Sequence, residues 1–226
     1  MRVFDYACSD AGCNVALDEE MLRLVGEAKP RRVSRDHAPT AHRRCVEVLS
    51  ENVGVGEAAL RIWEANTVCV CIGCNGDAKK DVNLDACERE NVPIFRRCSA
   101  GGAVVIGPGC LCYSLVAPYS YAEQLSYVGG SLTYLSGLLA DALNRDGKSL
   151  SISAEGDIIL GDRKVGGVAQ ARRRGVMLHH GTLLYDFDIQ CIERLLKHPA
   201  KAPSYRRGRA HREFLANVPT ERDALI

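Results

Sequence analysis

The 226-residue sequence predicts a mixed α/β domain of the α+β type, with largely antiparallel sheets flanked by helices. Short strand-like runs follow one another across glycine-containing turns instead of alternating with regular crossover helices. This pattern argues against a doubly wound parallel sheet. The length suits a single domain over 1–226, and we expect no accessory domain at the C-terminal end.

The first elements are a helix and a buried strand. Residues 16–25 have helical periodicity, and the acidic run from Asp18 predicts the first turn of that helix. Residues 30–44 are rich in Arg, His and Pro and predict a loop, followed by the end of a short helix at 46–49. The apolar run 67–72 predicts a buried strand.

Two strands are expected around a Gly-Pro-Gly turn. The run from 103 to 106 is strand-like, residues 107–109 turn the chain, and 111–116 return as a second strand-like run. We therefore predict a hairpin here.

The second half predicts one long helix, another hairpin and a short helix. Residues 121–143 form the longest helix candidate, because its leucines recur three or four positions apart. Gly129 and Gly130 inside it indicate a close approach of another element. Residues 158–165 predict a tight hairpin that turns at Gly161, and 188–197 predict a short helix.

Composition restricts the function classes. Apolar residues make up 46% and charged residues 25%, as in ordinary globular proteins, and the formal net charge is +1. This balance argues against a dedicated nucleic-acid binder. No apolar run is long enough to span a membrane, and the acidic N-terminal region does not resemble a signal peptide. We expect a cytoplasmic protein without a nucleic-acid or membrane partner.

The charge is nevertheless uneven. Between Arg163 and Glu213 there are twelve Lys and Arg against four Asp and Glu. A solvated basic face explains this excess as well as an anionic ligand or partner does.

The eleven cysteines read as free thiols in a reducing compartment, because the number is odd and no secretory signal precedes them. Cys69, Cys71 and Cys74 have a spacing that invites a zinc site, but no second cluster completes it. Cys69 and Cys71 read better as small buried apolar residues, and we expect no bound structural metal. Cys98, inside a glycine-rich run, is the cysteine expected nearest to chemistry.

Two glycine-rich runs carry the functional signal. The first, RRCSAGGAV at 96–104, contains Arg97, Ser99, Gly101 and Gly102. Glycines let backbone N–H groups approach a ligand, and arginine and serine donate hydrogen bonds to phosphate or carboxylate. A β-bulge with surface arginines is the structural alternative.

The second run, GDRKVGGVAQ at 161–170, places Lys164 among glycines and alanine. It matches neither the dinucleotide fingerprint nor the P-loop. A lysine held on a strand beside small residues can stabilise the charge of an acyl-adenylate. A surface strand lysine is the alternative that this pattern also allows.

Three segments in this order resemble the catalytic domain of lipoate–protein ligase A, within the biotin and lipoate protein ligase superfamily. RRCSAGGAV is similar to the family run Arg-Arg-x-Ser-Gly-Gly-Gly-Ala-Val, with Ala100 in place of the first glycine. Asp157 followed by GDRKVGGVAQ is similar to a second family pattern, and residues 179–184 read His-His-Gly-Thr-Leu-Leu as a third does. The resemblance implies the catalytic-domain fold of that superfamily.

The resemblance also implies a two-step reaction. Lipoate or octanoate reacts with ATP, with Mg²⁺ neutralising the triphosphate, to give an acyl-adenylate; a lysine of an acceptor lipoyl domain then displaces AMP. The acceptor would be of the 2-oxoacid dehydrogenase E2 or glycine-cleavage H-protein type. A separately encoded accessory subunit is a further implied partner, because many family members carry an accessory domain for the activation step.

Residue roles carry over in the same way. Lys164 would contact the acyl carbonyl and the α-phosphate, and Asp157 would hold either metal or Lys164. The residues that would line the acyl-adenylate site are Arg97, Ser99, Gly101, Gly102, Ala103, Gly167, Ala169, His180, Gly181 and Thr182.

Two other functions remain open at this point. An octanoyltransferase of the same fold would take octanoate from a carrier protein through a cysteine thioester, although no cysteine lies between Cys112 and Cys191. A non-catalytic binder of lipoate, or a scaffold that docks lipoyl domains through the arginines at 172–174 and 206–209, would not need Lys164.

Overall fold

The computed structural model describes residues 1–26, 48–49, 51–145 and 147–226. The strands are β1 (Arg2–Asp5), β2 (Ala59–Glu64), β3 (Cys69–Ile72), β4 (Ile94–Arg96), β5 (Val104–Ile106), β6 (Cys110–Pro118), β7 (Leu150–Ile152), β8 (Ile158–Leu160), β9 (Arg163–Arg173) and β10 (Val176–Leu184). The helices are α1 (Ala11–Gly26), α3 (Ala78–Asp81), α4 (Leu84–Arg89), α5 (Val128–Asn144), α6 (Ile189–Leu195) and α7 (His211–Phe214). Short 3₁₀ helices are η1 (Tyr119–Tyr121), η2 (Glu123–Ser126), η3 (Ser204–Arg206) and η4 (Arg222–Leu225).

Two sheets form the framework. Seven strands pair in the order β1-β2-β6-β10-β9-β8-β7, and three more pair in the order β4-β3-β5. In the large sheet only β1 and β2 are parallel, so the predicted mixed and largely antiparallel α/β fold is confirmed. The long β9–β10 hairpin, which turns through Arg174 and Gly175 with positive φ, was not anticipated.

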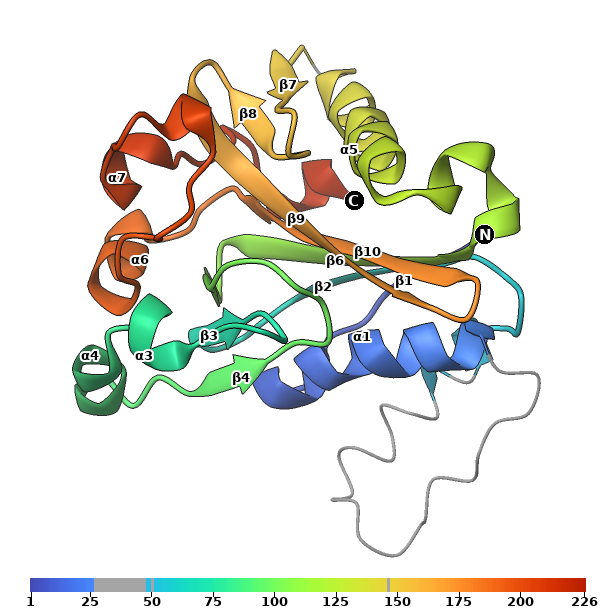
Figure 1. Ribbon diagram of the computed structural model, residues 1–226, viewed down its shortest axis with the longest axis horizontal. Coiled ribbons are helices and arrows are strands. Elements are labelled where there is room, and N and C mark those ends of the chain that lie inside the picture. The colour runs from blue at the N-terminus through green and yellow to red at the C-terminus, as the bar shows by residue number, and fades with distance from the viewer. Residues whose placement is uncertain (27–47, 50, 146) are drawn as a thin grey trace, which may run out of the picture.

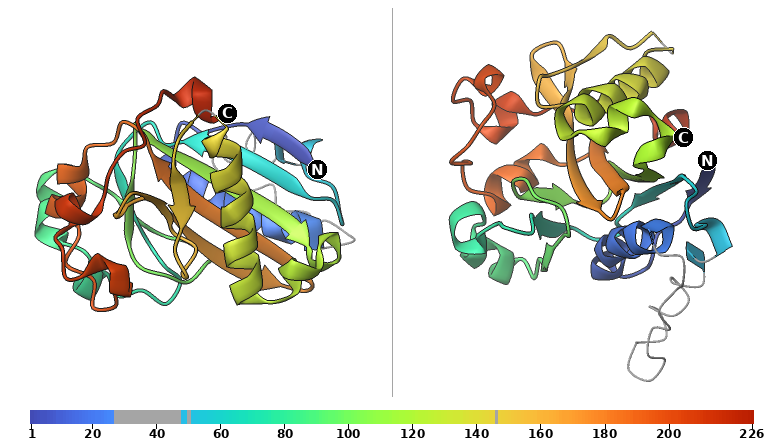
Figure 2. Two further views of the ribbon diagram at one scale, coloured as in Figure 1. Left: turned by 90° about the horizontal axis from the view of Figure 1, so that it is seen from above. Right: turned by 45° about the vertical axis from the view of Figure 1, so that its right-hand side comes forward.

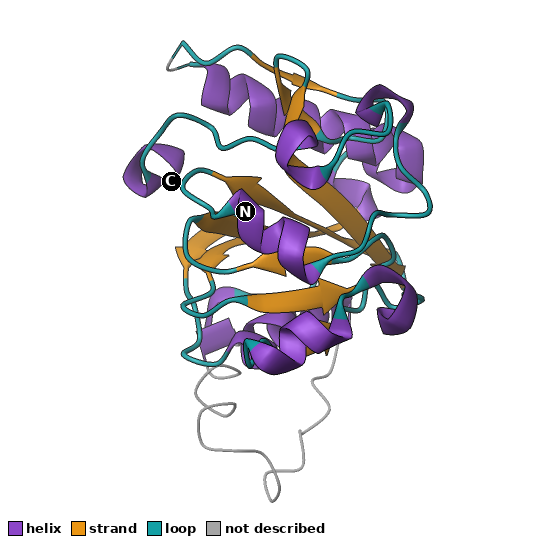
Figure 3. Cartoon of the chain, turned by 90° about the vertical axis from the view of Figure 1, so that its left-hand side faces the viewer, coloured by secondary structure: helices purple, strands orange, loops and turns teal. Residues whose placement is uncertain are grey.

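Helices cover the large sheet on both sides (Figures 1 and 3). α1 packs against β6 and β10, whereas α5 contacts β7 and β9 on the opposite face. Figure 2 shows α5 crossing the strands of the large sheet. A membrane span is not expected of any helix in the described ranges, since none is both long and apolar enough.

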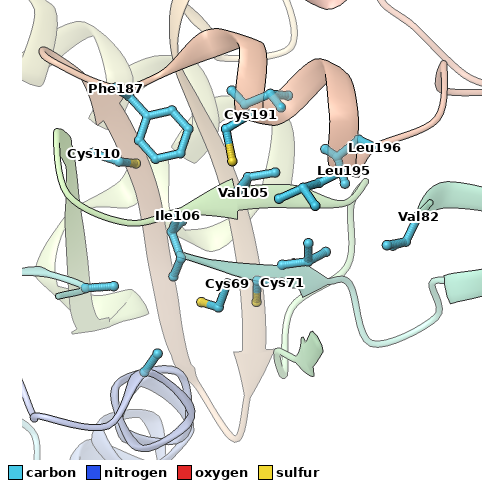
Figure 4. Packing of buried hydrophobic residues seen from close by; sticks show 14 of the residues in the cluster. Cys69, Cys71, Val82, Val105, Ile106, Cys110, Phe187, Cys191, Leu195 and Leu196 are labelled. Atoms are coloured by element: carbon cyan, nitrogen blue, oxygen red, sulfur yellow. The ribbon is translucent and has the colours of Figure 1, made fainter. Parts of the chain in front are cut away.

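The small sheet packs against α6 around a cysteine-rich core (Figure 4). Cys69 and Cys71 of β3 are buried, as predicted, and lie in one apolar cluster with Cys110 and Cys191. Nine cysteines of the described chain are free thiols. The prediction is wrong for Cys8, which is disulfide-bonded; sequence spacing alone does not show which cysteines pair.

Helix α1 begins five residues before the predicted start. Asp10 accepts a hydrogen bond from the Cys13 amide at 2.7 Å and so caps the helix, which makes an acidic first turn at Asp18 unnecessary. Asp18 lies instead within the helix, and 3% of its surface is exposed. The loop predicted over 30–44 lies outside the described residues, and residues 48–49 are helical.

The predicted hairpin over 103–116 is wrong. Both strands exist, but β5 pairs with β3 in the small sheet while β6 joins β2 and β10 in the large one. The glycine turn therefore passes the chain between sheets. Gly109 makes this possible, since its φ is +86° and an added Cβ would lie 2.1 Å from the Asp186 carbonyl oxygen.

We expect Gly109→Ala to destabilise the fold by about 2 kcal/mol or more, because left-handed strain adds to a backbone clash. Gly129→Ala is the matched control: it lies in α5, and no heavy atom of the described residues is within 4 Å of the added Cβ. The control should gain up to about 1 kcal/mol of helix propensity. Chemical denaturation measures both; an unchanged midpoint for Gly109→Ala would contradict the crowding.

Helix α5 is shorter than the predicted helix over 121–143, because η1 and η2 replace its first turns. Its buried residues are Ser131, Ser136, Ala140 and Leu143 rather than the leucine stripe. Ser131 Oγ donates to Gln170 Oε1 of β9 at 3.0 Å, so a polar contact with the sheet helps to set which face of the helix is buried. The predicted hairpin at Gly161 and the helix near 188–197 are confirmed as β8–β9 and α6.

Candidate active site

Lys164 is directed by an irregularity in the β8–β9 hairpin. Ile158 pairs with Gly166 and Ile159 with Lys164, which leaves Val165 as an extra residue in β9. Bulges of this kind re-aim side chains. A Cβ on Gly167 would lie 2.7 Å from Lys164 Nζ, so the glycine leaves the space that the ammonium group occupies.

Asp157 fixes the lysine. Lys164 Nζ donates to Asp157 Oδ1 at 2.8 Å, and Tyr205 Oη donates to Oδ2 at 2.8 Å. The Lys164 side chain is 27% exposed and that of Asp157 is 9% exposed. Both carboxylate oxygens are engaged, so this acid is suited to hold the lysine rather than to ligate a metal. Burial and the neighbouring Asp157 raise the pKa of Tyr205, which keeps it a donor.

Arg97 holds the first glycine-rich segment from within. Its Nε donates to Ser99 Oγ at 2.9 Å, and its Nη2 donates to the carbonyl oxygens of Ala100 and Gly102, each at 2.9 Å. Nη1 donates to the Cys71 carbonyl oxygen at 3.2 Å. The guanidinium group is thus occupied by the protein backbone instead of pointing its fork at a ligand.

A buried polar chain lies behind the same segment. Ser99 Oγ is 2.6 Å from His180 Nε2, and His180 Nδ1 is 2.6 Å from Asp18 Oδ2. Ser114 Oγ donates to Asp18 Oδ1 at 2.6 Å, and the fully buried Arg61 donates to the same oxygen at 3.3 Å. This chain ties α1 and β10 to the glycine-rich segment.

A cavity of about 180 Å³ opens beside these groups. Most of its wall is apolar or backbone, and its polar members are Asp18, Arg97, Tyr113, Lys164, His180 and Thr182. The lining residues are Val15, Asp18, Trp63, Cys71, Arg97, Gly101, Gly102, Ala103, Val104, Ile106, Cys112, Tyr113, Lys164, Gly167, Val168, Ala169, His180, Gly181 and Thr182. We call it the apolar cavity.

A second cavity, of about 250 Å³, meets the first at Lys164. Lys197, Lys201, Arg206 and His211 also line it, and we call it the basic cavity. Arg206 is 4% exposed, and its Nη2 has no hydrogen-bond partner among the described residues. A buried, unsatisfied guanidinium nitrogen is costly in a folded protein, which suits a site that receives an anion.

Ten of the twelve predicted site residues line the apolar cavity. The other two, Ser99 and Asp157, lie directly behind it and bind His180 and Lys164. Sequence reasoning missed Asp18 as part of the site, because it was read only as the start of an acidic first turn of a helix. It also missed Arg206, which stood only in an arginine-rich run.

The thiols near the site are protonated. Cys71 and Cys112 line the apolar cavity; burial raises the pKa of Cys71, and a hydrogen bond with Cys110 together with burial raises that of Cys112. Cys98, the cysteine expected nearest to chemistry, lines neither cavity, and burial raises its pKa to about 12. Within the described ranges, no three His, Cys, Asp or Glu side chains are grouped to hold a metal ion.

The arginine runs are largely engaged in the fold. Arg172 donates to Ser131 Oγ at 2.6 Å and stacks over Tyr119. Arg206 and Arg209 both lie over the Phe214 ring, and Arg209 pairs with Asp162 at 2.8 Å. These side chains therefore do not form one open basic surface.

The fold and the paired cavities define a class of protein that can hold an apolar group and an anionic group on either side of one lysine. The chain belongs to the family described as the lipoyl protein ligase A/B catalytic domain, whose model matches residues 10–221. The resemblance seen in the glycine-rich runs is thus confirmed at the level of the family.

Relatives within this family differ in reaction. The chain is 30% identical over 160 residues to a lipoate-protein ligase A of Blochmanniella floridana, covering 69% of this chain and 44% of that protein. It is 29% identical over 163 residues to an octanoyltransferase LipM of Clostridioides difficile, covering 64% of this chain and 60% of that protein. The chain spans about half the length of the first curated relatives it matches.

Solved structures share the fold. A lipoate-protein ligase A bound with ATP superposes with a TM-score of 0.71 at 20% identity, covering 99% of this chain and 80% of that one. A bi-partite lipoate protein ligase of Thermoplasma acidophilum, studied with its E2 lipoyl domain, gives 0.72 at 20% identity, covering 99% and 78%.

Proposed function

We propose that the chain is the catalytic part of a lipoate–protein ligase. In the first step a carboxylate oxygen of lipoate or octanoate attacks the α-phosphorus of ATP, and the bond to pyrophosphate breaks. In the second step the amine of an acceptor lysine attacks the acyl carbonyl, and the bond to AMP breaks as the amide forms. The amine gives up one proton to solvent in that step.

The observation that carries this proposal is the position of Lys164 between the two cavities. The apolar cavity suits an eight-carbon acyl chain, and the basic cavity suits the phosphates of a nucleotide. Charge builds on the α-phosphate and on the carbonyl oxygen where the two cavities meet. An ammonium group held there by Asp157 stabilises that charge without having to reorganise.

Magnesium enters this proposal with the nucleotide. Mg²⁺ keeps several waters and binds mainly through substrate phosphates and one or two carboxylates. Asp157 is engaged by Lys164 and Tyr205, whereas Asp81 lines the basic cavity and would be the residue to hold the metal of a bound Mg·ATP. When bound, the ion supplies charge neutralisation on the triphosphate.

The thiol chemistry favours a ligase over a carrier-dependent transferase. A transferase of this kind needs a cysteine that ionises readily beside the lysine. Cys71 and Cys112 are the cavity thiols of the described chain, and both have raised pKa values. The octanoyltransferase among the relatives keeps that second reaction as the alternative to be tested.

The acceptor we propose is a lipoyl domain of the E2 or H-protein type. The bi-partite lipoate protein ligase of Thermoplasma acidophilum is described together with its E2 lipoyl domain, which supports this choice of acceptor. Because that ligase has two parts, a separate accessory subunit should be tested for here as well.

The test is an acylation assay read by the intact mass of an apo lipoyl domain. Protein, Mg·ATP and lipoate are incubated together, and octanoyl-carrier protein without ATP is run in parallel. The proposal predicts an ATP-dependent lipoyl adduct, or an adduct from synthetic lipoyl-adenylate if activation needs a partner. Transfer from the carrier protein alone would establish the transferase. Binding of lipoate without any adduct would establish the non-catalytic binder.

The basic cavity yields a separate prediction. Arg206→Met removes the unpartnered Nη2 but keeps an apolar stem over Phe214, so the KM for ATP should rise about tenfold or more, the value of a lost charge-assisted hydrogen bond. The KM for lipoate should stay unchanged. Arg207→Met is the control, because its exposed side chain lies outside the cavity. Equal effects of both variants, or a shift confined to lipoate, would refute the assignment.

A further inference from the structure

Behind the cavity, buried hydrogen bonds run from Trp63 at one end and Arg97 at the other to Asp18, and these ends set the direction of each bond. Trp63 Nε1 can only donate, and it lies 3.2 Å from Ser114 Oγ. Ser114 accepts there, so its own proton goes to Asp18 Oδ1 at 2.6 Å. Arg61, which also only donates, binds that oxygen as well. Asp18 is therefore the acceptor at the centre of the chain.

The other end sets the remaining protons. Arg97 Nε can only donate, and it donates to Ser99 Oγ at 2.9 Å. Ser99 therefore has its proton left for His180 Nε2, 2.6 Å away. Asp18 accepts at Oδ2, so a neutral His180 ring carries its proton on Nδ1, 2.6 Å away, and its Nε2 accepts the Ser99 proton. All protons of the chain point toward Asp18.

Ser99 is an anchor in this arrangement, not an attacking group. The line of serine, histidine and aspartate has the connectivity of a catalytic triad. However, Ser99 is 1% exposed and does not line the apolar cavity, whereas His180 does. Both ring nitrogens of His180 are engaged, so neither is left to take a proton from an acceptor amine.

The segment that Ser99 anchors forms one wall of the cavity. Gly101 and Gly102 line it, and the Ser99 carbonyl oxygen accepts from the Cys74 amide at 2.8 Å. Asp18 of α1, which contacts His180, also contributes to the cavity wall. A change in the ring proton of His180 would thus be passed to the backbone that faces the substrate.

We propose that Asp18 is a positioning residue, which holds the His180 proton on Nδ1 and thereby keeps Ser99 and the segment 97–102 in their reactive placement. The effect on turnover rests on the proposed acyl-transfer function. The position of the His180 proton does not depend on that function. In Asp18→Asn the amide oxygen serves Ser114 and Arg61, and its NH₂ group faces His180. Nδ1 then becomes an acceptor, the ring proton moves to Nε2, and the Ser99 proton loses its acceptor.

The experiment reads both nitrogens of His180 in long-range ¹H–¹⁵N spectra of protein labelled with ¹⁵N-histidine, assigned by the signals lost in His180→Gln. The wild type should carry the proton on Nδ1, and Asp18→Asn should carry it on Nε2. The kcat for acyl transfer should fall about 10²-fold in Asp18→Asn, as displacement of a positioned group does. Ser114→Ala is the matched control, because it removes one donor to the same carboxylate without changing the histidine proton.

The outcomes are separable. A His180 proton on Nε2 in the wild type, or on Nδ1 in Asp18→Asn, shows that Asp18 does not set the position of this proton and overturns the proposed tautomer. A moved proton with unchanged kcat, or an equal loss in Ser114→Ala, overturns the positioning role. If Asp18→Asn does not fold, Ser99→Ala replaces it: the proton should stay on Nδ1 while kcat falls, and an unchanged kcat overturns the role. An inactive wild type with the proton on Nδ1 refutes the proposed function but still supports the proposed tautomer of His180.

Discussion

Lys164→Met should lower the kcat for acyl transfer by about 10³-fold, the upper range for loss of one preorganised charge donor. Methionine keeps most of the side-chain volume but removes the ammonium group at the junction of the cavities. Neither the phosphate nor the carbonyl oxygen is then stabilised. Single-turnover transfer from synthetic lipoyl-adenylate measures the effect without depending on the activation step.

Loss of the lysine also leaves the Asp157 carboxylate with Tyr205 as its one side-chain partner among the described residues, so stability must be separated from chemistry. Lys164→Met combined with Asp157→Asn removes both charges, and it should recover the melting temperature but not the activity. Lys80→Met is the control for a lysine whose side chain is 81% exposed. If Lys164→Met turns over like that control, the lysine is not the charge donor.

Gly73→Ala should have the second largest effect, through geometry alone. An added Cβ would lie 2.2 Å from the Gly101 carbonyl oxygen and 3.2 Å from the Ala100 carbonyl carbon. The end of β3 therefore has to push the glycine-rich segment toward the cavity. We expect kcat to fall about 10²-fold, because small displacements near reacting atoms carry large penalties.

The same variant should lose about 1–3 kcal/mol of stability, as overpacked positions do. Assays run well below its melting temperature distinguish this from the activity loss. Gly129→Ala, which has open space around the added methyl group, serves as the control and should match the wild-type kcat. A fully active Gly73→Ala would show that the segment tolerates displacement.

Local patterns predicted the elements whose partners are near in sequence. The hairpin at Gly161 is set by its turn, and α6 by the Asp188 cap, which accepts from the Gln190 amide at 2.9 Å. The strands β5 and β6 were also found, but their pairing was not. A Gly-Pro-Gly turn carries no information about whether the next strand returns to the same sheet.

The candidate site likewise contains residues that the local sequence predicts and residues that only the folded structure reveals. Glycines and a lysine in a short run identified Lys164 and Gly101, because backbone openness and charge are local properties. Asp18 and Arg206 become visible only when the chain closes: Asp18 meets His180 across 162 positions, and Arg206 is buried by packing on Phe214. A buried acid inside a helix reads as an ordinary helix residue until its partners are known.

If one lysine serves two cavities, a structure of the protein with a non-hydrolysable lipoyl-adenylate analogue should show both cavities occupied on either side of Lys164. We expect the acyl chain in the apolar cavity beside Cys71 and Cys112, the nucleotide in the basic cavity near Arg206, and Lys164 Nζ within hydrogen-bond distance of the linking group. An analogue lying wholly in one cavity, with Lys164 still bound only to Asp157, would contradict it.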